Sequence, residues 1–251
     1  MNSVTGLSGA KLASRERGVL LATALMVTAI LWWLLTADLL TSGHAVHHAA
    51  SPGFIQTFFM WMAMMVAMML PPVLPWIWFY AATTKATGSS SDTVSWSQTL
   101  IFGSGYFLLW GGYSLLATVV QLSMTASGWL NHNLAVSSTA GGTILIAAGL
   151  FQFSPLKTTC LKHCRSPLTY FMTSYHRGPA GALRMGFGHG LYCLVCCWAI
   201  MAIAFALGTM NMAWMAAAML IFCIEKIAPG GQIFSKVFGF GFVVSGVFLI
   251  I

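Results

Sequence analysis

The feature that most constrains this chain is a series of long apolar segments that carry almost no charge. Charged residues make up 6% of the 251 residues, whereas hydrophobic residues make up 58% and the mean hydropathy is +0.83. A water-soluble domain needs about a quarter of its residues charged to cover its surface. The sequence therefore predicts an integral membrane protein of the helical kind, because the strands of a membrane β-barrel would give shorter, alternating segments.

Seven segments are apolar enough to cross a bilayer, for which a helix needs about 20 residues. They are 19–40, 54–81, 99–123, 138–156, 185–207, 210–227 and 233–251. The predicted fold is all-α: a polytopic membrane bundle of about seven transmembrane helices, in which residues 1–251 form a single domain. The second segment contains Pro71, Pro72 and Pro75, and we expect these prolines to kink or break its helix because each lacks a backbone donor.

The basic residues indicate how the chain is oriented in the bilayer. If the N-terminus is cytoplasmic, all eleven Lys and Arg fall on the cytoplasmic side of a seven-span chain. Most of them lie in an N-terminal tail, 1–18, and in a basic loop, 157–184. Because Lys and Arg are enriched in cytoplasmic loops, we expect a cytoplasmic N-terminus and an external C-terminus. The net charge of +7 is then explained by topology and anionic lipid, so we expect no nucleic-acid partner.

The fifth segment carries four metal-capable side chains in the stretch GHGLYCLVCCW, residues 188–198. On an α-helix His189, Cys193, Cys196 and Cys197 share an arc of about 100°. Imidazole and thiolate groups together suit Cu(I) or Zn(II). Cysteine is also a common apolar packing residue, which is our interpretation of Cys197 alone. Histidine inside a membrane is costly and usually functional, so we predict a metal or redox role for the other three.

A second thiol pair, Cys160 and Cys164, occurs in CLKHC at the end of the fourth segment. Residues four apart share a face if the helix continues. This pair and the thiol pair of the fifth segment could then converge on one tetrahedral site, as structural zinc or a copper waystation requires. In the alternative, Lys162, His163 and Arg165 form a basic edge against lipid headgroups. We expect no stable disulfide here, because the cytosol is reducing.

The second segment contains a methionine stripe in FMWMAMMVAMMLPP, residues 59–72. Met64, Met65, Met68 and Met69 fall on one face of a helix. Thioether sulfur favours Cu(I), but methionine is also a flexible packing residue. A kinked helix exposes backbone carbonyls and opens space for a site, so the stripe has both interpretations.

Two further features are polar groups near the ends of segments. The first external loop contains His44, His47 and His48, which either recruit Cu(II) or Zn(II) weakly or simply form a solvated loop. Glu225 lies close to the end of the sixth segment, and we expect it to pair with the adjacent Lys226.

Three stretches carry a resemblance to a known family: MWMAMMVAMMLPPVLP, FSPLKTTCLKHCRSPL and the segment from GALRMGFGHG to IFCIEKIAP. The chain resembles a bacterial family of metal-binding integral membrane proteins that is linked to copper delivery to copper oxidases such as tyrosinase. The resemblance covers about residues 55–230. It implies a multi-pass protein of the bacterial inner membrane. It also implies that the family pattern includes Cys160, Cys164, His189, Cys193, Cys196 and the stripe from Met64 to Met69.

Together these features predict a membrane copper-binding protein that acts as a copper chaperone or relay. It would hold Cu(I), with zinc as the alternative metal, and deliver it to a copper-dependent oxidase. We expect no enzymatic activity, because no catalytic triad, phosphate loop or paired acid is visible. Two alternatives stay open: a thiol–disulfide oxidoreductase that uses Cys193 and Cys196, and a structural subunit of a membrane complex in which Met, Trp and Cys only pack.

Overall fold

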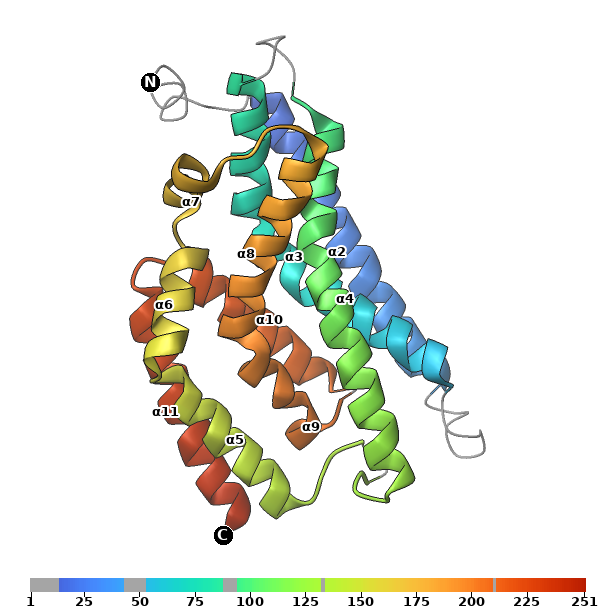
Figure 1. The fold of residues 1–251 in the computed structure, drawn as a ribbon. Coiled ribbons are helices and arrows are strands. Elements are labelled where there is room, and N and C mark those ends of the chain that lie inside the picture. The colour runs from blue at the N-terminus through green and yellow to red at the C-terminus, as the bar shows by residue number, and fades with distance from the viewer. Residues whose placement is uncertain (1–13, 43–52, 88–93, 132–133, 210) are drawn as a thin grey trace.

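The computed structural model describes residues 14–42, 53–87, 94–131, 134–209 and 211–251, and within these ranges the chain is a bundle of helices without strands (Figure 1). The helices are α2 (Ser14–Ser42), α3 (Phe54–Thr87), α4 (Trp96–Ala126), α5 (Ser138–Gln152), α6 (Pro155–Cys164), α7 (Pro167–Ser174), α8 (Gly178–Ala202), α9 (Ala204–Leu207), α10 (Met212–Ile227) and α11 (Gly231–Ile250). Each of the seven predicted segments contains a helix. The prediction of an all-α fold is therefore confirmed.

Five helical stretches in the described ranges are long and apolar enough to cross a membrane: 18–37, 54–85, 96–126, 178–207 and 231–250. The fourth predicted segment differs, because α5 and α6 meet at an angle of 66° and count as a sixth span only if the bent pair is taken together. The sixth predicted segment forms α10, which has 16 residues and is short for a bilayer. The count of seven and the positions of the termini stay predictions.

Helix α3 runs through Pro71, Pro72 and Pro75 without ending, so of the two expected effects, a kink or a break, the break does not occur. The axis of α3 instead changes direction along its length (Figure 1). A proline inside a helix removes a backbone hydrogen bond and bends the axis, and packing against neighbouring helices holds the remainder together. One face of α3 consequently stays continuous from Trp61 to Tyr80, and both of these side chains are fully buried.

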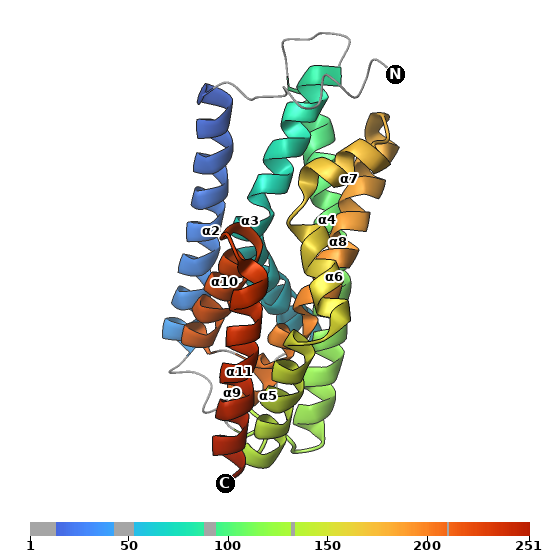
Figure 2. The ribbon, with the colours of Figure 1, turned by 90° about the vertical axis from the view of Figure 1, so that its left-hand side faces the viewer.

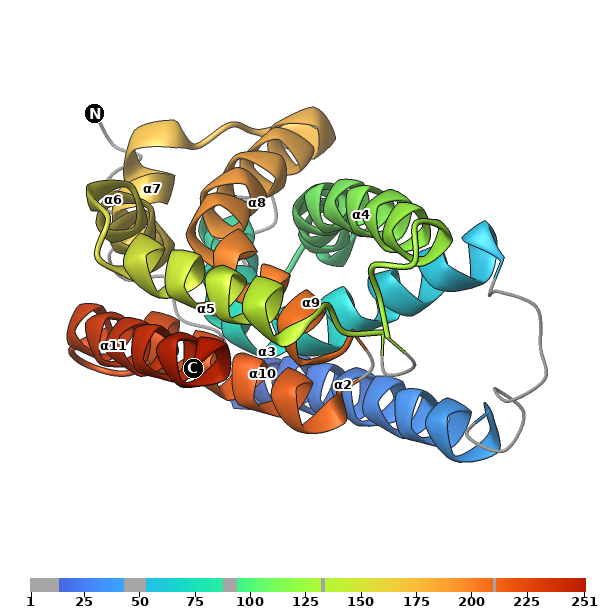
Figure 3. The ribbon, with the colours of Figure 1, turned by 90° about the horizontal axis from the view of Figure 1, so that it is seen from below.

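The helices form three rows when the bundle is viewed from below (Figure 3). Helices α2, α10 and α11 lie along one side, α4 and α8 lie along the other, and α3 and α5 run between them. Helix α6 and the joint between α10 and α11 lie near the middle height of the bundle (Figures 1 and 2). The segment 157–184, which the sequence predicts as a basic loop, contains most of α6, all of α7 and the start of α8. Residues of α6 and α10 therefore reach the centre of the molecule.

Helices α4 and α8 approach each other closely because glycine lies at the contact. A Cβ atom on Gly186 of α8 would collide with the backbone carbonyl of Phe102 in α4. Gly105 of α4 faces the backbone of Leu183 in the same way. Small residues at such contacts allow helix backbones to pack tightly. This contact brings Tyr106 of α4 against the cysteine-bearing face of α8.

The close contact predicts that Gly186→Ala destabilises the protein by about 1–3 kcal/mol, because the added methyl group has no space. The matched control is Gly112→Ala in α4, where nothing lies within 4 Å of an added Cβ atom. The control should be neutral or slightly stabilising, since alanine favours helix more than glycine does. Thermal unfolding of the purified variants in detergent measures both effects, and equal unfolding temperatures for the two variants would contradict the prediction.

Candidate metal site

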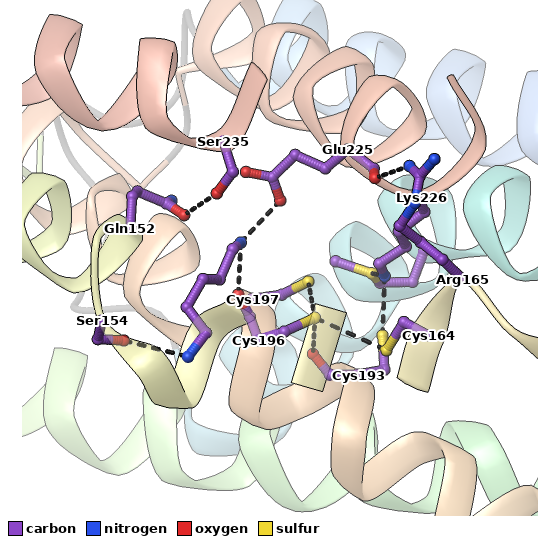
Figure 4. A network of polar contacts seen from close by, with 12 residues as sticks. Gln152, Ser154, Cys164, Arg165, Cys193, Cys196, Cys197, Glu225, Lys226 and Ser235 are labelled. Atoms are coloured by element: carbon purple, nitrogen blue, oxygen red, sulfur yellow. Dashed lines mark hydrogen bonds and ion pairs between the residues drawn. The ribbon is translucent and has the colours of Figure 1, made fainter. Parts of the chain in front are cut away.

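Four cysteines gather where α6 crosses α8, and we call Cys164, Cys193, Cys196 and Cys197 the thiol cluster (Figure 4). The Sγ atom of Cys196 lies 3.3 Å from that of Cys197 and 3.8 Å from that of Cys164. The thiol of Cys196 also lies 3.2 Å from the backbone carbonyl of Cys193. All four cysteines are free and buried. Helical spacing in α8 supplies three of the sulfur atoms, and α6 supplies the fourth.

Lys226 of α10 extends its ammonium group to the thiol cluster. Its Nζ atom lies 2.9 Å from the Sγ atom of Cys193 and 3.8 Å from the Sδ atom of Met69 in α3. The hydroxyl group of Tyr106 lies 3.0 Å from the same sulfur of Cys193. A positive charge thus lies between a thiol and a thioether that belong to different helices.

His189 lies one helical turn before Cys193 and is enclosed by aromatic rings. Its ring stacks on Trp76 of α3 at a centroid distance of 3.6 Å, and Tyr106 of α4 covers it at 5.4 Å. The indole of Trp76 in turn donates a hydrogen bond of 2.7 Å to the carbonyl of Cys164. Nδ1 of His189 is buried and has no hydrogen-bond partner among the described residues. A buried ring nitrogen without a hydrogen-bond partner is unusual. This nitrogen is therefore available to coordinate a metal ion or to bond with a bound molecule.

The remaining predicted ligands are buried around this centre. Met64, Met65 and Met68 belong to the hydrophobic core, with Met69 at the end of the stripe nearest Lys226. Cys160 is buried one turn before Cys164, but in the described ranges no hydrogen bond joins its sulfur to the thiol cluster. Nor do any three His, Cys, Asp or Glu side chains there form an arrangement that could hold a metal ion. The structure therefore brings Cys164 and the α8 thiols together without a ready tetrahedral site.

Comparison with known proteins gives the family. A sequence model of the PpoB2 family, described as copper chaperone, matches residues 58–249. The chain belongs to the PpoB2 family of copper chaperones. The matched region contains the whole methionine stripe, the Cys160 and Cys164 pair, the three cysteines of α8 and His189. The match supports a copper-related role. His44, His47 and His48 lie outside both the PpoB2 match and the described residues. No curated protein and no solved structure matches the chain.

A buried ion pair that the sequence does not predict lies beside the thiol cluster. Nζ of Lys157 in α6 lies 2.7 Å from Oε2 of Glu225 in α10, and the two side chains are 1% and 0% exposed. The same ammonium donates a hydrogen bond of 2.7 Å to the carbonyl of Cys196. The expected pair of Glu225 with Lys226 is wrong, because consecutive residues point to different sides of a helix. The predictive signal is Glu225 itself, since an acidic side chain in an apolar helix needs a partner.

Arg165 also turns into the protein. Its guanidinium group donates hydrogen bonds of 2.5 and 2.6 Å to the carbonyls of Glu225, in the last turn of α10, and of Ala228, just after it. These carbonyls have no partner within the helix, so a basic side chain completes the helix end. His163 stacks on Tyr192 of α8 with 4.2 Å between ring centroids. Lys162 is exposed, so only part of the predicted basic edge lies outside the bundle within the described chain.

The ion pair predicts a large and non-additive effect on stability. Lys157→Met or Glu225→Leu alone leaves a buried charge without its partner and should cost about 3–5 kcal/mol of unfolding free energy. The double variant should be more stable than either single variant, because it removes both charges. Lys162→Met is the matched control at an exposed lysine of the same helix and should change stability little. Unfolding by denaturant in detergent gives all four values, and strictly additive losses would contradict the role of the pair.

Proposed function

We propose that this chain is an integral membrane protein of the bacterial inner membrane that binds Cu(I) at the thiol cluster and delivers it to a copper-dependent oxidase. The observation that carries the proposal is the convergence of three α8 cysteines with Cys164 of α6, beside the thioether of Met69. Membership of the PpoB2 copper chaperone family supports the choice of cargo.

The ligand chemistry favours Cu(I) over zinc. Thiolate and thioether sulfur are soft ligands, and Cu(I) accepts as few as two of them. A structural zinc ion instead requires a closed tetrahedral set of ligands, and the described residues offer no such set. Burial of the sulfur atoms excludes water, and thiolates offset the charge that a cation brings into an apolar region. We therefore propose that Cu(I) is held by pairs of sulfur atoms drawn from Cys164, Cys193 and Cys196.

The surrounding donors suit transfer by ligand exchange. Nδ1 of His189 lies in the same buried region without a protein partner, and the methionine stripe offers weaker thioether donors along α3. A series of sites with similar, moderate affinity lets a cation leave as readily as it enters. The protein then acts as a relay, and we propose no covalent catalysis by its side chains.

The buried cluster argues against a thiol–disulfide oxidoreductase. Thiol exchange requires a thiolate to attack the disulfide of a partner, and access limits that reaction. The four cysteine residues of the thiol cluster are at most 3% exposed. A protein disulfide would not reach them without opening of α6 and α8. The remaining alternative is a structural subunit that binds no metal. Measuring the copper content of the protein distinguishes this alternative from the proposal.

The proposal predicts about one Cu(I) per chain when the full protein is purified in detergent and loaded without oxygen. Cys193→Ser/Cys196→Ser should lose this copper while keeping its helical content, because serine is a poor ligand for a soft cation. Cys223→Ser is the matched control, since Cys223 lies in α10 outside the thiol cluster. Elemental analysis and circular dichroism check the outcome. Absence of copper from the unmodified protein would favour the structural subunit, and copper retained by the double variant would place the site elsewhere.

A further inference from the structure

Lys226 occupies the position that a cation would take between two sulfur ligands. Its ammonium group contacts the sulfur of Cys193 in α8 and that of Met69 in α3. A thiol–thioether pair from two helices is suited to Cu(I), and a lysine ammonium supplies the same single positive charge. We propose that Lys226 is a displaceable cation that fills the Cys193–Met69 position in the metal-free protein and leaves when Cu(I) binds. This inference rests on the proposed function and adds a control element to its site.

The surroundings of Lys226 explain why a cation belongs there when copper is absent. Cys193 has both an ammonium and the hydroxyl of Tyr106 as polar neighbours. Sulfur atoms that can carry negative charge are unfavourable in an apolar interior unless a positive group lies beside them. Exchange of the ammonium for Cu(I) replaces one positive charge by another at the same atoms. The charge of the buried region is therefore similar with and without cargo.

Lys226 is held by weaker contacts than Lys157. In the described structure Lys157 is held by the carboxylate of Glu225 and the carbonyl of Cys196 and is fully buried. Lys226 instead contacts sulfur atoms and the ring of Phe222 at 5.6 Å. It is only half-buried and lies one residue before the end of α10. A long flexible side chain at a helix end can withdraw its head group toward the surface while its stem stays packed.

Competition for the sulfur atoms gives Lys226 a role in release. Protein molecules in which the ammonium occupies Cys193 are unable to bind Cu(I). The apparent affinity for Cu(I) is therefore the intrinsic affinity multiplied by the fraction of molecules in which the position is open. When copper passes to another ligand, the returning ammonium takes the vacated position and opposes rebinding. A site of high intrinsic affinity is thereby kept exchangeable, as delivery to a recipient enzyme requires.

The first test compares Cu(I) affinity of the full protein in detergent, measured without oxygen by competition with a chromophoric Cu(I) chelator. Lys226→Leu should bind Cu(I) about tenfold more tightly and release it to the chelator more slowly, because the competing cation is gone. Lys162→Leu removes the same charge at an exposed position of α6 and should leave affinity unchanged. An unchanged or weaker affinity in Lys226→Leu would overturn the proposal and indicate that the lysine supports the site.

The second test uses the unmodified protein and does not depend on a variant that folds. An amine-reactive succinimidyl ester is applied to the metal-free and the Cu(I)-loaded protein, and labelled peptides are quantified by mass spectrometry. Lys226 should gain label on copper loading, whereas Lys157 should stay unlabelled in both states. If copper binds and Lys226 labelling does not change, the displacement is refuted and the proposed function stands. If the unmodified protein binds no copper, the proposed function itself fails.

Discussion

The contact between Lys157 and Glu225 determines how the rest of the central region is arranged. One ammonium group joins three helices, because it pairs with a carboxylate of α10 and donates to a carbonyl of α8 while its own backbone belongs to α6. Desolvation of two opposite charges is tolerated only where each has close partners. This requirement fixes the rotation of α6 and α10 about their axes. The rotation of α6 directs Cys164 toward Cys196, and the rotation of α10 directs Lys226 toward Cys193.

Two buried or half-buried lysines near this contact have different partners. Lys157 neutralises a carboxylate and serves the architecture, whereas Lys226 faces sulfur and has no carboxylate within ion-pair distance in the described structure. The two ammonium groups belong to different helices, α6 and α10. The aromatic side chains of Trp76 and Tyr106 close the site around His189. The sulfur atoms and Lys226 thus lie beside helices that the Lys157–Glu225 ion pair holds together.

The sequence predicts the class of fold and the residue types of the site better than it predicts the contacts between helices and between side chains. Long apolar segments identify every major helix, and helical spacing places His189, Cys193 and Cys196 on one buried face of α8. The bend between α5 and α6 is not predicted, because the residues of α6 after 156 are polar and their composition indicates a loop. The partners of Glu225 and Lys226 are also missed, since rules that assign lysine to loops ignore contacts between distant helices. Cys160 and Cys164 look equivalent in sequence, yet α6 brings only Cys164 into the thiol cluster in the described structure.

The separation of these contacts along the chain has a consequence for biosynthesis. Met69 and Lys226 are 157 positions apart, and Lys157 precedes Glu225 by 68. A ribosome produces α3, α6 and α8 before α10, so the nascent protein holds its sulfur atoms and a lysine without its carboxylate partner until α10 emerges. A product truncated before α10 lacks both the carboxylate that orders α6 and the ammonium that covers Cys193. Assembly of the centre therefore requires that α10 has been synthesised.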